Sequence, residues 1–228
     1  MALLGNGVLA IWNGISQSAE TEFVRWHVTE HIPERVGLPG FLRGRRYVTH
    51  DGHPKYFNFY ETTTAAVLES PVYRDRLNAP TPWTQRVVKE FRDTSRTKCE
   101  VALSLGRGEG GWIEAIQFWG AQPDNELANE AVGDLLVEIS KQDGIVGVHL
   151  LRGIVDRQAA PTAESKLRGQ PDSQCDWILL IEGAELHFVQ PLRSTLASDA
   201  SLQRKSGSAR IARGIYRLQY GLTHDEAG

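Results

Sequence analysis

Short apolar runs that end at glycine, proline or polar turn residues divide the chain into elements. Residues 7–14 form a continuous apolar run, which is typical of a buried strand. Residues 23–32 then repeat apolar side chains every three or four positions, which predicts a helix with one apolar face. Pro33 and the GLPG segment at residues 37–40 are expected to end this helix.

The rest of the first half continues with strands and helices. The dipeptide Asp51-Gly52 is a strong hairpin signal between two runs rich in aromatic residues. Two prolines, Pro80 and Pro82, interrupt the helical pattern that follows. The predicted elements are strands at 41–49, 56–62 and 97–105, and helical stretches at 64–77 and 83–91. The order is therefore βαββαβ.

The second half repeats this order after a glycine-rich joint at residues 106–111. Its predicted elements are strands at 112–120, 145–155, 176–182 and 211–222, helices at 126–141 and 186–202, and a polar loop at 156–173. The fold class is therefore α+β, with two tandem ferredoxin-like βαββαβ units at residues 1–106 and 111–228. Helices cover one face of each antiparallel sheet, so the other sheet is the natural cover for the second face, as in an α/β barrel.

Composition narrows the class of partner. The 228 residues carry 25 Lys and Arg against 28 Asp and Glu, so no basic excess indicates a nucleic-acid partner. No run of about 20 apolar residues indicates a membrane span, and residues 1–6 do not resemble a secretory signal. Only two cysteines occur, Cys99 and Cys175, which favours reduced thiols and a cytoplasmic location. A homodimer is left open.

Motifs in the first half resemble a known family. These are Trp26-His27-(x)2-Glu30-His31-Ile32-Pro33, Pro39-Gly40-Phe41, Arg45-Arg46-Tyr47, Ser70-Pro71-Val72-Tyr73 and Thr81-Pro82-Trp83-Thr84. Together they resemble the EthD-like branch of the dimeric α/β-barrel superfamily over about residues 7–105. The resemblance implies a ferredoxin-like barrel. It implies little about the reaction, because that superfamily includes cofactor-free isomerases, cyclases, haem-handling proteins and small monooxygenases.

The two halves serve as internal controls for each other. At matched positions the first unit carries polar side chains where the second mostly carries apolar ones. A buried polar group without a partner costs about 1–3 kcal/mol, so a binding or catalytic role explains this asymmetry directly. The matched pairs are His27 with Val132, His31 with Leu136, Asn58 with Leu179, Arg45 with His149, and Tyr47 with Leu151.

His27 and His31 are the candidate catalytic pair. They are four residues apart, so both rings lie on one helix face. Imidazole both takes and gives protons near neutral pH, which suits His31 as the acid–base catalyst with His27 assisting. The last turn of the predicted helix would favour the His31 cation. The alternative is a hydrogen-bonded core pair.

Two neighbours on the next strand complete the predicted catalytic set. Arg45 is expected to hold a carboxylate or enolate oxygen, and Tyr47 to donate to the same oxygen. Strand alternation places Phe41, Arg43, Arg45 and Tyr47 on one face, and Tyr56, Asn58 and Tyr60 on one face of the following strand. The predicted substrate-binding residues are Trp26, Arg43, Asn58, Tyr60, Tyr73 and Trp83. Their aromatic rings favour a flat or apolar ligand.

No metal site is predicted. A pair of histidines at i and i+4 supplies half of one, but no acidic residue or cysteine follows at a matching spacing. The letters HVTEH at residues 27–31 match an inverted zincin motif, yet that motif needs a long helix, and Pro33 is expected to end this one.

The sequence therefore predicts a small-molecule enzyme that performs cofactor-free acid–base chemistry of the isomerase, lyase or cyclase type. Its substrate would be a small, partly apolar or aromatic metabolite that bears an oxygen anion. Two alternatives stay open: a haem-binding protein or oxygenase-like enzyme with a histidine ligand, and a ligand-binding accessory protein without catalysis.

Overall fold

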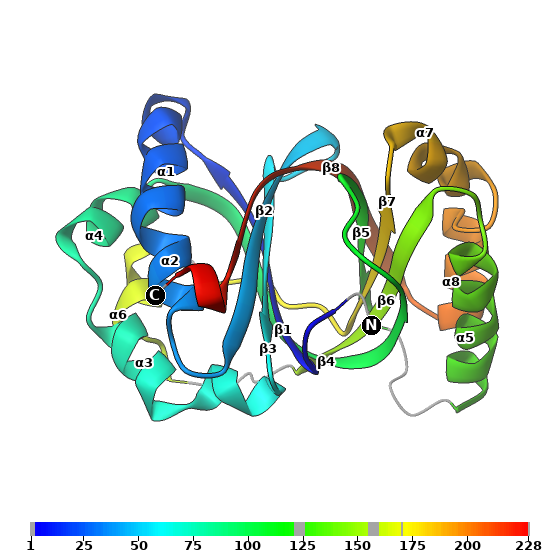
Figure 1. Cartoon of the computed structure of the whole chain (residues 1–228), viewed down its shortest axis with the longest axis horizontal. Coiled ribbons are helices and arrows are strands. Elements are labelled where there is room, and N and C mark those ends of the chain that lie inside the picture. The colour runs from blue at the N-terminus through cyan, green and yellow to red at the C-terminus, as the bar shows by residue number, and fades with distance from the viewer. Residues whose placement is uncertain (1–2, 121–125, 155–159, 170, 228) are drawn as a thin grey trace.

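The chain closes into one antiparallel barrel of eight strands (Figure 1). The computed structural model describes residues 3–120, 126–154, 160–169 and 171–227. The strands are β1 (Gly7–Ile15), β2 (Phe41–Asp51), β3 (Tyr56–Thr62), β4 (Phe91–Gly106), β5 (Trp112–Trp119), β6 (Ile145–Ile154), β7 (Trp177–Gly183) and β8 (Arg210–Thr223). Around the barrel they run in the order β1-β3-β2-β8-β5-β7-β6-β4.

This order confirms the predicted fold of two ferredoxin-like units. One sheet reads β4-β1-β3-β2 and the other β8-β5-β7-β6, and the two join edge to edge through the β2–β8 and β4–β6 pairs. Closure leaves no free sheet edge. It is achieved within one chain, so a second copy is not needed to complete the barrel.

Helices cover the barrel on two opposite sides (Figure 1). On one side lie α1 (Glu20–Trp26), α2 (Ile32–Val36), α3 (Pro71–Asn78) and α4 (Pro82–Val88). On the other lie α5 (Glu126–Ser140), α7 (Leu186–Val189) and α8 (Asp199–Ser206). Side-chain hydroxyls of Ser70, Thr81 and Ser198 cap α3, α4 and α8, which explains where these helices begin. No described helix is long and apolar enough to cross a membrane.

The short helix α6 (Ala163–Leu167) was not predicted, because it lies in a polar stretch of the second unit. It packs on the first unit, beside α3 and α4 (Figure 1). The side chain of Thr162 caps its first turn, and the Asn78 side chain accepts a hydrogen bond from Ala163 N at 3.0 Å. The connection between β6 and β7 therefore brings second-unit residues to the first unit's helical layer.

The prediction that Pro33 ends the first helix is wrong. The chain passes from α1 through a π-helical turn, His27–His31, directly into α2, which ends at Val36. The Ile32 N–H donates to the His27 carbonyl five residues back. Proline in a regular helix clashes with the carbonyl four residues earlier. The wider π turn relieves this clash, and Pro33 sits in the first turn of α2.

A β-bulge corrects a second prediction. The register of β2 against β3 shifts between Phe41 and Arg43, so these residues do not share a face. Phe41 packs outside the barrel with Tyr60 and Tyr73. Beyond the bulge, Tyr47 packs inside the barrel with Phe57 and Phe59, and Arg45 shares that inward face.

Apolar side chains fill much of the barrel interior, and a buried ionic cluster lies among them. Arg45 is fully buried and stacks over the Phe59 ring at 4.2 Å. Its guanidinium donates to Glu182 Oε2 at 2.9 Å and to Glu61 Oε1 at 3.2 Å. Burial opposes ionisation of Glu182, but Arg45 and His149 outweigh it and lower the pKa of this carboxyl to about 2. Arg45 thus links a carboxylate of each unit across the barrel.

We expect Arg45→Met to lower the free energy of unfolding by about 3–5 kcal/mol, because two buried carboxylates lose their shared cation. Urea denaturation measures this loss. The double variant Arg45→Met/Glu182→Leu should recover part of it. Arg217→Met, on an exposed side chain of β8, is the matched control and should change stability by less than about 0.5 kcal/mol. A loss at Arg45 no larger than this control would contradict the role of the cluster.

Candidate functional site

A small cavity lies between the outer face of the first sheet and the helix that contains the π turn. Its volume is about 30 Å³, which suits about one water molecule. Trp26, His27 and His31 line it from the helix, and Asn13, Asn58 and Tyr60 line it from the strands. Tyr56, Asn58 and Tyr60 share one face of β3, as alternation predicts, and the structure shows that this face points outward.

The two histidines are packed among aromatic rings. Their ring centroids are 5.3 Å apart at 19°, and Phe23 stacks on His27 at 5.1 Å while Trp26 lies 4.3 Å from His31. The exposed fractions of His27 and His31 are only 3% and 7%. Neither Nδ1 atom has a hydrogen-bond partner among the described residues. The alternative of a hydrogen-bonded core pair therefore does not account for these nitrogens.

Burial lowers the pKa of both histidines well below the usual value. For His27 the cations of Arg46 and Arg35 add to this effect, and for His31 those of Arg35 and Arg168 do. Both imidazoles are therefore neutral near pH 7. The prediction that a helix end favours the His31 cation is wrong, because the helix continues past His31 to Val36.

The structure separates the predicted catalytic set. Arg45 and Tyr47 point into the barrel, on the opposite side of the sheet from the histidines. Arg43 points inward with them and pairs with Glu61 at 2.7 Å. On the histidine side the neighbouring arginine is instead Arg46, which donates to the Val24 carbonyl at 3.2 Å. The bulge in β2 decides this difference.

The predicted substrate-binding residues divide in a similar way. Trp26, Asn58, Tyr60 and Tyr73 line the cavity together with the histidines. Asn58 donates to the Asn13 side chain at 2.9 Å, and its own Oδ1 has no partner among the described residues. Trp83 does not line the cavity. It lies half-buried, with the Arg25 guanidinium 5.2 Å from its ring centroid.

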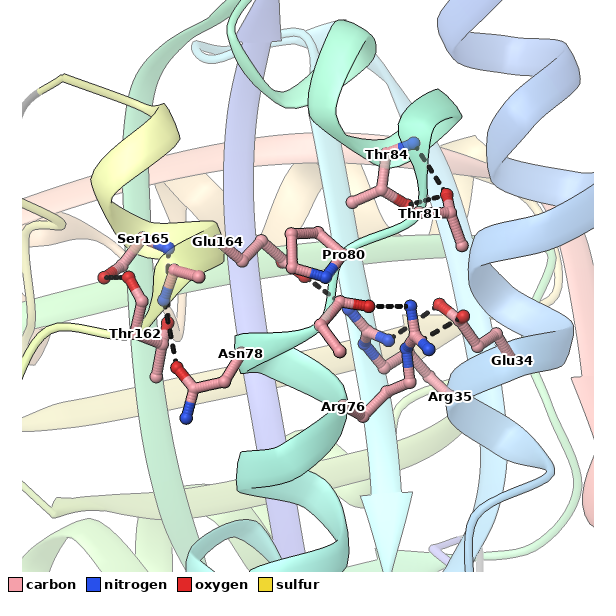
Figure 2. Close-up of polar contacts among 12 residues, drawn as sticks. Glu34, Arg35, Arg76, Asn78, Pro80, Thr81, Thr84, Thr162, Glu164 and Ser165 are labelled. Carbon is pink, nitrogen blue, oxygen red and sulfur yellow. Dashed lines mark hydrogen bonds and ion pairs between the residues drawn. The ribbon is translucent and has the colours of Figure 1, made fainter.

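Several further lining residues were not found from the sequence, among them Asn13, Arg35, Arg96, Glu164 and Arg168. Side chains alternate between the two faces of a strand, and this alternation along β1 could have placed Asn13 on the face of the cavity. No local pattern places the last two residues here, because they arrive with the long β6–β7 connection. Figure 2 shows Glu164 of α6 directed at Arg35 of α2, with which it pairs at 2.5 Å.

Glu30, the acidic residue of the HVTEH motif, forms hydrogen bonds with side chains of the helical layer. Glu30 accepts hydrogen bonds from the Trp26 indole N–H at 3.2 Å and from the Thr81 hydroxyl at 2.6 Å. Thr81 in turn caps α4, beside Thr84 (Figure 2). No group of three or more His, Cys, Asp or Glu in the described part of the chain could hold a metal ion.

Comparison with known proteins supports the fold alone. No protein-family model and no curated protein sequence matches the chain. Among solved structures, an anthrone oxidase-like protein is 12% identical with a TM-score of 0.66, and the match covers 97% of this chain and 94% of that one. A Fusobacterium nucleatum protein described as a monooxygenase is 11% identical, with a TM-score of 0.60 and coverage of 97% and 96%.

A third similar structure, described as a chlorite dismutase, is 10% identical with a TM-score of 0.54, and the match covers 99% of each chain. The chain therefore has the dimeric α/β-barrel, ferredoxin-like fold, with both sheets in one polypeptide.

The neutral histidines predict how stability depends on pH. Below about pH 6.5 the unfolded chain protonates both imidazoles while the folded chain does not. The unfolded state then binds more protons, so the free energy of unfolding falls as pH falls, by up to about 1.4 kcal/mol per pH unit for each histidine. Above about pH 6.5 this contribution is fully present.

Urea denaturation at pH 7.5, 6.0 and 5.0 tests this expectation. The reference is the double variant His27→Leu/His31→Leu, which carries at both positions an apolar residue like those of the second unit. Between pH 7.5 and pH 5.0, the free energy of unfolding should fall by more in the wild-type protein than in the variant. Parallel pH dependences would show that the two histidines titrate normally.

Proposed function

We propose that the cavity is the active site of an oxygenase that removes a proton from an enolisable aromatic substrate and lets the resulting anion react with O₂. The observation that carries this proposal is the pair of buried, neutral histidines whose Nδ1 atoms have no hydrogen-bond partner in the part of the chain that the structure describes. The similarity in fold to an anthrone oxidase-like protein and to a protein described as a monooxygenase supports an oxygenase over an isomerase or lyase.

The histidines would act as bases because they are unprotonated at neutral pH. His31 lies against Trp26 and lines the cavity, so its imidazole is the first choice for taking the substrate proton, with His27 stacked behind it. The indole and phenol rings of Trp26, Tyr60 and Tyr73 favour a flat substrate. Arg35 and Arg46 are cations whose charges lower the pKa of the histidines. The same charges would stabilise an anion that forms in the cavity.

The oxygen step balances without a cofactor. His31 takes one proton from the CH₂ group of the substrate, and the delocalised carbanion transfers an electron to O₂. The two radicals combine to form a C–O bond, and the peroxide anion takes a proton back from the imidazolium. Loss of water from this hydroperoxide leaves a ketone, so substrate plus O₂ gives the quinone-type product plus water.

A haem-binding role is the alternative, and it would need both imidazoles to leave their packing against Phe23 and Trp26. A cavity of about 30 Å³ is smaller than a haem and smaller than a flat aromatic substrate, so binding of either requires one wall to give way. The wall that contains the short helix α6 is the one we expect to move, and its Glu164–Arg35 pair is the contact that would open.

The first unit alone would carry this site. In the second unit the corresponding face under α5 is filled by Leu136, Leu179 and other apolar side chains.

The motifs around Trp26–Tyr47 support a relationship to the EthD-like branch. The two buried free thiols, Cys99 and Cys175, support a cytoplasmic location.

The proposal is tested with anthrone as the substrate probe, by measuring O₂ uptake and by following the absorbance of the anthraquinone product. The wild-type protein should make O₂ uptake and anthraquinone formation faster than in buffer alone. We expect His31→Gln to lower kcat by about 10²–10⁴-fold, because it removes the base. His50→Gln, which removes an exposed histidine at the end of β2, should leave the rate unchanged.

A second measurement separates the oxygenase from the alternatives. Deuterium at the acidic carbon is followed in the absence of O₂. Its loss to solvent, with no O₂ uptake when air is admitted, would replace the oxygenase by proton-transfer chemistry alone. Saturable anthrone binding with neither reaction would indicate a non-catalytic binding protein.

A further inference from the structure

The histidine cavity shares a wall with a much larger groove. The groove has a volume of about 1030 Å³ and lies along the outer face of β4, between α3 and the segment that carries α6. Three residues line both spaces, and all three are charged: Arg96, Glu164 and Arg168. A ligand that enters the cavity from the groove passes these side chains.

Two of these three residues already have partners of opposite charge. Glu164 pairs with Arg35 at 2.5 Å, and Arg168 forms two hydrogen bonds to the Asp172 carboxylate at 2.8 and 2.6 Å. Arg96 differs from both. It donates from Nη2 to the Tyr73 hydroxyl at 2.7 Å, and no carboxylate of the described residues lies within 4 Å of its guanidinium.

An arginine in this position has unused binding capacity. The guanidinium carries five N–H donors in a planar fork that matches a carboxylate, and the bond to Tyr73 uses one of them. Arg96 is half-buried, and burial alone would lower the pKa of its guanidinium, but Tyr73, Asp172 and Glu164 outweigh this effect and keep it charged. The nearby groove cations Arg74 and Lys98 differ, because both pair with Glu69.

We propose that Arg96 is a specificity-determining residue that binds the carboxylate of an aromatic acid, with the ring placed in the cavity beside His31. The rest of the molecule then lies in the groove. This inference rests on the proposed function for the choice of site, and it adds the preferred substrate class: an aromatic carboxylic acid, which is expected to bind more tightly than a neutral aromatic compound such as anthrone.

Calorimetric binding of 2-naphthoate and of neutral 2-naphthamide tests this assignment, because the two probes share one shape. The wild-type protein should bind the carboxylate about tenfold or more tightly than the amide, as a charge-assisted pair requires. Arg96→Gln should abolish this preference, and Arg96→Lys should keep part of it, because lysine retains the charge without the fork.

Arg92→Gln is the matched control, since Arg92 is an exposed arginine on the same strand and lines neither space. It should keep the full preference for the carboxylate. The assignment is overturned if Arg96→Gln keeps the preference, if wild-type protein binds the amide equally well, or if it binds neither probe.

The same measurement in His31→Gln distinguishes this inference from the oxygenase proposal. Binding there should still prefer the carboxylate, because Arg96 is intact. Arg96-dependent binding without O₂ consumption by any aromatic acid would reject the oxygenase and leave the anion site in place. Turnover that does not depend on Arg96 would support the oxygenase and reject the anion site.

Discussion

The closed barrel requires its interior to be filled from all eight strands, and the Arg45 cluster is a charged part of that filling. Arg45 comes from the first unit and reaches Glu61 of its own sheet and Glu182 of the other. A buried guanidinium needs compensating carboxylates, and this one finds them only when both sheets close around it. The geometry of closure and the pairing of these charges therefore depend on each other.

Closure also determines where a small molecule can bind. The inner faces of both sheets are occupied by side chains such as Trp12, Phe57 and Leu180. Binding space remains on the outer faces, beneath the helices. In the second unit apolar side chains fill most of that space, with the Glu114 carboxylate paired to Arg193 and Arg213, whereas in the first unit it holds two neutral imidazoles and a set of amide and phenol groups. Polar residues of the first unit thus divide between a structural cluster inside the barrel and a candidate site outside it.

The π turn is the local device that presents the histidines. It sets His27 and His31 in a nearly parallel stack and carries the chain past Pro33 into α2, from which Arg35 reaches Glu164. One widened turn therefore places the candidate bases and also the anchor for α6. The second unit takes part in the first unit's candidate site through that anchor, although the described residues of its own outer face include no such histidine pair.

The order of the main elements, the duplication and the shared face of Tyr56, Asn58 and Tyr60 on β3 were readable from the sequence, because hydrophobic periodicity reports which residues of an element share a face. The histidine pair and most of its aromatic lining were found in the same way. The side of the sheet occupied by Arg45 was not, since one bulge after Phe41 reverses the alternation on which the prediction relied.

Tertiary structure alone decided the remainder of the site. Whether Pro33 breaks the helix depends on the energy of a rare turn that packing stabilises, and composition does not report it. Glu164 and Arg168 lie more than 100 residues from the histidines in the sequence. They join the cavity only because barrel closure folds the β6–β7 connection across the first unit. The sequence determined the fold and the candidate bases through local periodicity, while the walls and charges around those bases came from long-range contacts that no local pattern encodes.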